Sequence, residues 1–198
     1  QVISFYKGEP ILVDSGVCSY DNWEMYMYLH FFKAHNVVYC DDFTDPHQCK
    51  ITPNIESVDL ENGTMKIKTL VEHEDGRGFI WTRSIKVTER EMIFEDEATS
   101  ESSLNFRSRF LLKRNDVLFP GMSKGFEQDL KKFKYSDKNV MQLLTESYIM
   151  TLTSDKDIIQ DISPVMNENN KLDYAVVVEA RERCKVFKNK TVFHFEDR

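Results

Sequence analysis

Residues 61–71 read Glu-Asn-Gly-Thr-Met-Lys-Ile-Lys-Thr-Leu-Val, and from Met65 onward apolar and polar side chains alternate. A period of two is typical of a strand with one buried face. The Asn62-Gly63 dipeptide before it favours a tight hairpin turn. Further strands of this kind are predicted at 79–87, 91–98, 104–112, 147–153, 174–178 and 191–195. Such strands, separated by short polar turns, predict an all-β fold, an antiparallel β-sandwich.

Two stretches depart from this alternation. Phe126, Leu130 and Phe133 stand at helical spacing, which predicts one short surface helix over 126–134. The stretch 173–186 contains Glu-Ala-Arg-Glu-Arg, a helix-compatible core, but the flanking valines favour a strand. No repeat, low-complexity tract or linker divides the chain, so residues 1–198 are predicted to form a single domain.

Composition excludes several classes of protein. The 198 residues are 41% hydrophobic with a net charge of −7, which excludes disorder and argues against nonspecific nucleic-acid binding. No apolar run reaches the roughly 18 residues of a membrane-spanning helix. The cysteines show no C-x-x-C spacing, which excludes a zinc ribbon or thioredoxin motif; they are Cys18, Cys40, Cys49 and Cys184. Two disulfides are permitted and none is required.

The first fifty residues carry the candidate chemistry. The apolar strand Ile11-Leu12-Val13 ends at Asp14, next to the flexible Ser15-Gly16 pair. His35 follows an aromatic-rich block at 22–32 and precedes the strand 37–40. A carboxylate at a strand end is often a turn cap, and a lone histidine before a strand is usually structural. Residue type alone therefore favours structural roles for both side chains.

Together these residues resemble a known family. Phe5-Tyr6-Lys7-Gly8-Glu9-Pro10-Ile11-Leu12-Val13-Asp14-Ser15-Gly16, Ser19-Tyr20 and Ala34-His35-Asn36 are similar to the core of the heparinase II/III-like polysaccharide lyases. That family builds its enzyme from an α/α toroid followed by a β-sandwich. The resemblance implies that residues 1–198 are the C-terminal sandwich and that the N-terminal catalytic toroid is absent from this chain. The start at Gln1, directly before a strand, is in keeping with an excised piece.

The resemblance also implies a metal. In the family the sandwich holds a structural zinc through a histidine, an aspartate and a second histidine. Asp14 matches the aspartate and His35 the second histidine, while the block carrying the first histidine would lie before Gln1. Zinc prefers four ligands, so two from this chain would form an incomplete, weak site. The alternative is an Asp–His hydrogen bond without a metal.

The chemistry implied by the resemblance is β-elimination on a uronate-containing, acidic polysaccharide. A base removes the C5 proton and an acid, usually a tyrosine, protonates the leaving oxygen. Tyr20 matches the family tyrosine that faces the interdomain cleft, and it is the candidate catalytic residue; core packing is favoured for Tyr26 and Tyr28. Val37 replaces the usual threonine, which removes a hydroxyl. We expect the chain alone to be inactive, its parent to be a secreted, periplasmic or cell-surface lyase, and its missing partner to be the toroid.

Two alternatives stay open. A noncatalytic carbohydrate-binding sandwich could stack sugar rings on Trp23, Trp81 and Tyr135, although most aromatic side chains of a period-two sheet belong to the core. A purely structural interaction domain is also compatible with the sequence. A hydrolase is disfavoured, because no carboxylate pair can be nominated among 33 acidic residues.

Overall fold

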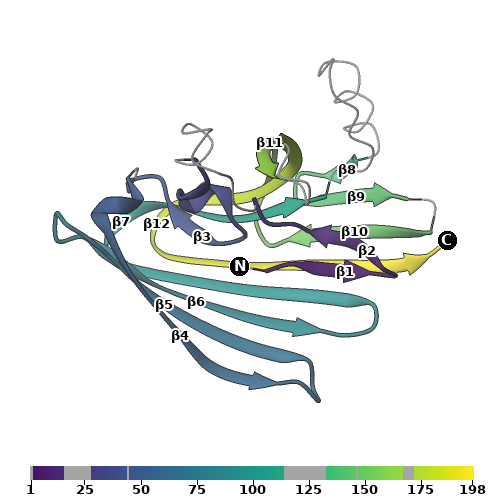
Figure 1. The fold of residues 1–198 in the computed structure, drawn as a ribbon, viewed down its shortest axis with the longest axis horizontal. Helices are drawn as coiled ribbons and strands as arrows, with labels where there is room; N and C mark the ends of the chain where they lie inside the picture. Colours follow the sequence, from purple (N-terminus) through teal and green to yellow (C-terminus); the bar gives the residue numbers. More distant parts are fainter. Residues whose placement is uncertain (1, 16–27, 44, 114–132, 146, 167–171) are drawn as a thin grey trace.

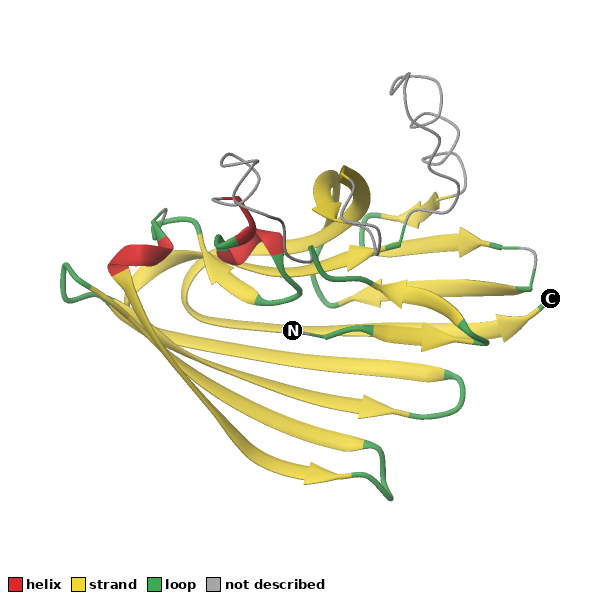
Figure 2. Cartoon of the chain, in the orientation of Figure 1, coloured by secondary structure: helices red, strands yellow, loops and turns green. Residues whose placement is uncertain are grey.

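The computed structural model describes residues 2–15, 28–43, 45–113, 133–145, 147–166 and 172–198. Within this part of the chain, regular structure is almost entirely β (Figure 2), with two short 3-10 helices, η1 (Phe32–Ala34) and η2 (Pro46–Gln48). None of the described helices is long and apolar enough to cross a membrane. The strands are β1 (Ser4–Tyr6), β2 (Glu9–Leu12), β3 (Val38–Cys40), β4 (Cys49–Asp59), β5 (Thr64–His73), β6 (Gly78–Val87), β7 (Glu91–Leu112), β8 (Phe133–Asp137), β9 (Val140–Leu144), β10 (Tyr148–Ser154), β11 (Ile158–Met166) and β12 (Leu172–Asp197).

All strand pairs among the described residues are antiparallel. The main hydrogen-bonded path runs β4-β5-β6-β7-β12-β10-β9-β8, and it confirms the predicted antiparallel class. The β1–β2 hairpin and β3 join this path along β7, and β11 joins it along β12. The predicted strands at 91–98 and 104–112 are parts of one strand, β7, and those at 174–178 and 191–195 are both in β12.

The two long strands create the sandwich by bending. Thr99 pairs with Val186 and Leu104 with Cys184, so residues 100–103 of β7 lie opposite Lys185 alone. Extra residues on one strand of a pair bend it, and such bends let a strand pass from one sheet to another. Figure 1 shows β12 curving back on itself at this bend. Both strands therefore belong to two layers, and alternation along the sequence did not reveal that the halves are continuous.

We define the layers by these halves. The first layer contains β4, β5, β6, residues 91–99 of β7, residues 186–197 of β12, and β8–β10. The second layer contains residues 104–112 of β7 and 172–184 of β12, with β2, β3 and β11 along them.

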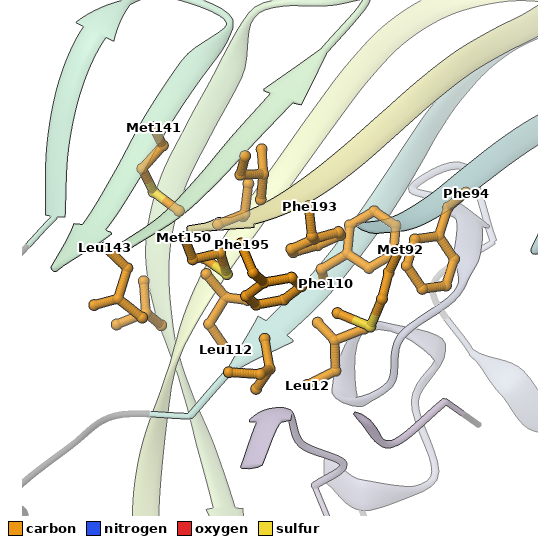
Figure 3. Packing of buried hydrophobic residues seen from close by; sticks show 14 of the residues in the cluster. Leu12, Met92, Phe94, Phe110, Leu112, Met141, Leu143, Met150, Phe193 and Phe195 are labelled. Carbon is orange, nitrogen blue, oxygen red and sulfur yellow. The ribbon is translucent and has the colours of Figure 1, made fainter. Parts of the chain in front are cut away.

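The main core lies between the two layers (Figure 3). Phe110 of the second layer meets Phe94 and Phe193 of the first, with ring centroids 4.9 and 5.3 Å apart. Such tilted and edge-on pairs favour both burial and a fixed packing geometry. The buried members of the cluster are Ile11, Leu12, Met92, Phe94, Phe110, Leu112, Met141, Leu143, Tyr148, Met150, Leu152, Val176, Val178, Phe193 and Phe195.

Three local predictions have mixed outcomes. The strand expected within 173–186 is confirmed as part of β12. The turn before β5 is longer than a two-residue hairpin, because Asp59 pairs with Thr64 and leaves residues 60–63 as the loop. Of the helix predicted at 126–134, residues 126–132 lie outside the described residues, and 133–134 begin strand β8.

Candidate functional site

Asp14 and His35 meet beside the second layer. The β1–β2 hairpin turns at Lys7 and Gly8, both at positive φ, and directs Ile11 and Leu12 into the core. The chain then leaves β2 with the Val13 N–H donating to the Leu111 carbonyl of β7 at 2.9 Å, which positions Asp14. His35 directly follows η1, and its Nδ1 lies 2.9 Å from Asp14 Oδ2.

The hydrogen bonds of the His35 ring limit its chemistry. Its Nε2 lies 2.9 Å from the Leu29 carbonyl oxygen, which only accepts, so Nε2 carries a hydrogen. On the other side one proton lies between Nδ1 and the Asp14 carboxylate. Both ring nitrogens are thus engaged by acceptors of the protein. Among the described residues no group of three His, Cys, Asp or Glu side chains is placed to hold a metal ion. The Asp14–His35 hydrogen bond is the contact that the metal-free alternative describes, and zinc ligation by these two residues stays a prediction.

Asn36 connects three segments of the chain. Its Nδ2 donates to the carbonyls of Val2 at 2.8 Å and Val13 at 2.6 Å, and its Oδ1 accepts the Leu111 N–H at 2.6 Å. The preceding Ala34 is fully buried and its carbonyl accepts from the Ser15 hydroxyl. In this structure the Ala34-His35-Asn36 motif therefore braces the N-terminal hairpin against β7.

A buried ion pair contacts the backbone of Asn36. Arg83 of β6 donates through Nε and a terminal nitrogen to the two carboxylate oxygens of Asp96, at 2.7 and 2.8 Å. Its other terminal nitrogen donates to the Asn36 carbonyl at 2.8 Å. Ser108 and Trp81 also donate to Asp96, so the buried charges are compensated on several sides. The pair links the first layer to the second.

A second charged cluster lies on the outer face of the second layer. Alternation along β7 places Arg107 and Arg109 opposite the core-facing Phe106 and Phe110. Both arginines donate to the buried Glu179 carboxylate of β12. The Arg109 Nε has no hydrogen-bond partner within the described residues.

Tyr39 of β3 completes this cluster. Its hydroxyl donates to Glu179 at 3.0 Å. Burial, reinforced by the Glu179 carboxylate, raises the pKa of Tyr39 well above its ordinary value. The sequence analysis did not predict this cluster. The two-residue spacing of Arg107 and Arg109 is a signal for a shared face of one strand, but Glu179 is 70 residues from Arg109.

The remaining candidates are placed as follows. Tyr20, Tyr26, Trp23 and Cys18 lie outside the described residues, as does the side chain of Tyr135. The Tyr28 hydroxyl bonds Ser163 of β11, and Trp81 is held by Asp96 at the layer interface, which favours packing for both. The described cysteines, Cys40, Cys49 and Cys184, are free thiols. Burial raises the pKa of the Cys40 thiol to about 12, so it is a poor nucleophile at neutral pH.

Comparison with known proteins agrees with this architecture. The family model described as Heparinase II/III-like, C-terminal, matches residues 4–192. A heparinase III structure with methylated lysines superposes with a TM-score of 0.72 at 13% identity, covering 99% of this chain and 29% of that one. The heparan sulfate lyase HepC from Pedobacter heparinus gives 0.69 at 13% identity, covering 99% and 30%. A further heparinase III gives 0.60 at 14%, covering 95% and 28%.

These similarities have a defined reach. At such low identity the superpositions establish the fold, the β-sandwich of these enzymes, and nothing finer. The chain spans less than a third of the length of each of these structures. A comparison with curated protein sequences gives no match.

Proposed function

The chain belongs to the heparinase II/III-like, C-terminal family, and from this premise we propose that it is the sandwich part of a lyase that cleaves uronate-containing polysaccharide by β-elimination. The observation that carries the proposal is the family match across nearly the whole chain. It is supported by the shared fold of structures named as heparinase III and heparan sulfate lyase.

In this proposal the chain supplies one wall of a cleft. The other catalytic groups come from a part of the parent protein that this chain does not include, since the chain covers only 29% of the heparinase III structure with methylated lysines. The brace made by Asp14, His35 and Asn36 holds the N-terminal hairpin on β7. Tyr20 remains the candidate catalytic residue that this chain contributes to the cleft. A parent that acts on an extracellular polymer would be secreted, periplasmic or on the cell surface.

Zinc at Asp14 and His35 is a separate proposal. Bound there, it would act as a structural brace in place of the proton between His35 Nδ1 and Asp14, with further ligands from outside the described residues. Elemental analysis of the purified chain tests it. We expect clearly less than one zinc per chain, because two protein ligands bind zinc weakly. Full occupancy that is lost on His35→Ala would show a complete site instead.

The activity has a direct test. The full-length parent and the 198-residue chain are incubated separately with heparan sulfate, and the ultraviolet absorbance of unsaturated uronate is followed. The parent is expected to generate this absorbance and the chain alone to leave the polymer intact. A parent that releases no unsaturated product from any uronate polysaccharide would overturn the proposal.

A further inference from the structure

A small hollow opens beside β3, next to the cluster of Tyr39, Glu179 and the two arginines. Its volume is about 130 Å³. It is lined by Phe31, Phe32, Lys33, Tyr39, Cys40, Asp41 and Phe43. Most of this lining is aromatic, and the two charged groups have opposite signs.

The aromatic wall is partly open to solvent. Phe31 and Phe32 are half-buried, whereas Tyr39 and Phe43 are buried behind them. Half-buried rings at a concave surface present apolar faces that an apolar ligand surface can cover. The C–H face of a pyranose ring is such a surface, and its rim carries polar groups.

Lys33 brings a positive charge to the rim. Its exposed ammonium lies 5.3 Å from the ring centroid of Phe31 and 5.6 Å from that of Tyr28, within cation–π range. Within the described part of the chain, no carboxylate forms an ion pair with Lys33. An anionic group seated in the hollow therefore meets an ammonium that no carboxylate of the described residues pairs with.

Asp41 brings a fixed acceptor. Its carboxylate is held by Nε and a terminal nitrogen of Arg107, and Arg107 is held in turn by Glu179. The side chain of Asp41 is still 37% exposed. A carboxylate fixed in this way and still in contact with solvent can accept hydrogen bonds from sugar hydroxyls without first becoming ordered.

We propose that this hollow binds one uronate unit of an acidic polysaccharide. The sugar ring covers Phe31 and Phe32, the uronate carboxylate pairs with Lys33, and a ring hydroxyl donates to Asp41. This inference rests on the proposed function for the class of polymer, and it adds a binding subsite on this chain.

The test is a titration of the 198-residue chain with an unsulfated, uronate-containing heparan disaccharide, followed by NMR and calorimetry. Lys33→Gln is expected to weaken binding about fivefold, the order of one exposed charge pair. Lys86→Gln removes the same charge from an exposed position on β6 and is expected to change affinity by less than about twofold. Phe31→Leu keeps the apolar bulk and tests the ring.

Each outcome decides the question. Equal affinity of wild type and Lys33→Gln, or shifted resonances remote from 31–43, would overturn the subsite. Binding that requires sulfate on the disaccharide would overturn the assignment to the carboxylate. Lyase activity of the parent without binding by this chain would leave the proposed function standing and refute the subsite. Binding without any lyase activity in the parent would refute the proposed function alone.

Discussion

At the scale of single residues, Asn36 is the side chain on which the N-terminal segment depends most. Its amide makes hydrogen bonds to Val2, Val13 and Leu111, three points that are far apart in sequence. Asn36 itself is only 1% exposed, so water cannot replace these partners if the amide is removed.

We therefore expect Asn36→Ala to lower the free energy of unfolding by about 3 kcal/mol, since several buried polar groups would lose their partner at once. Urea denaturation measures the change. Asn54→Ala, at an exposed position of β4, is the matched control and is expected to change stability by less than about 0.5 kcal/mol. Equal stability of the two variants would contradict the bracing role.

Tyr39 predicts a loss of stability in alkali. Its folded pKa is raised by burial and by Glu179 above the unfolded value of about 10. The folded state therefore retains the hydroxyl proton longer than the unfolded state, so this contribution is present below about pH 10 and is lost as the pH rises further. The pKa of Tyr148 is also raised, by burial and by Glu9, so Tyr148 contributes to the same loss of stability in alkali.

The measurement is the free energy of unfolding as a function of pH, with tyrosinate absorbance recorded in parallel. Tyr39→Phe should reduce the downward slope above about pH 10, and adding Tyr148→Phe should reduce it further. An unchanged slope in the double variant would show that other groups cause the alkaline loss.

At the scale of elements, two turns test backbone strain separately from crowding. Gly8 and Gly63 both have positive φ, at 80° and 62°. A Cβ on Gly8 would meet nothing within 4 Å, whereas one on Gly63 would lie 2.3 Å from the Val87 carbonyl oxygen. Gly8→Ala is expected to cost about 1 kcal/mol from strain alone. Gly63→Ala is expected to lower the free energy of unfolding by at least about 1 kcal/mol more than Gly8→Ala does, because the backbone at Val87 must also shift. Thermal denaturation of both variants would show equal losses if the close approach were unimportant.

The Arg83–Asp96 pair connects β6 with both halves of β7 and with the backbone carbonyl of Asn36. Arg83→Ala leaves the Asp96 carboxylate buried without its cation, and we expect a loss of about 3–5 kcal/mol. The double variant Arg83→Met, Asp96→Leu removes both charges and should be more stable than Arg83→Ala. Denaturant titration compares the two, and a double variant less stable than the single one would contradict an ionic origin of the loss.

At the scale of the whole molecule, β7 and β12 make the two layers one cooperative unit. Each strand contributes to both layers, and the aromatic contacts of Phe110 cross between them. One layer therefore cannot unfold alone without disrupting β7, β12 and the core between the layers. The edge strand β4 is different, since Ile51, Ile55 and Val58 are exposed along its length.

Hydrogen exchange in the native state tests this cooperativity. Amides in 92–98 and in 106–112 should have opening free energies that agree within about 1 kcal/mol and equal the global free energy of unfolding. Amides of β4 should have lower opening free energies. Markedly weaker protection of one half of β7 would show that a layer unfolds on its own.

Local patterns in the sequence determined the strand class and the family, because alternation and short motifs act over a few residues. They also singled out Asp14 and His35, which the structure joins by a hydrogen bond. Only the tertiary structure decided that four predicted strands are two bent ones, that Asn36 braces the N-terminal hairpin, and that Glu179 joins two arginines. These depend on which distant segments meet once β7 and β12 bend, and residues 70 or more positions apart leave no periodic trace of that meeting in a single sequence.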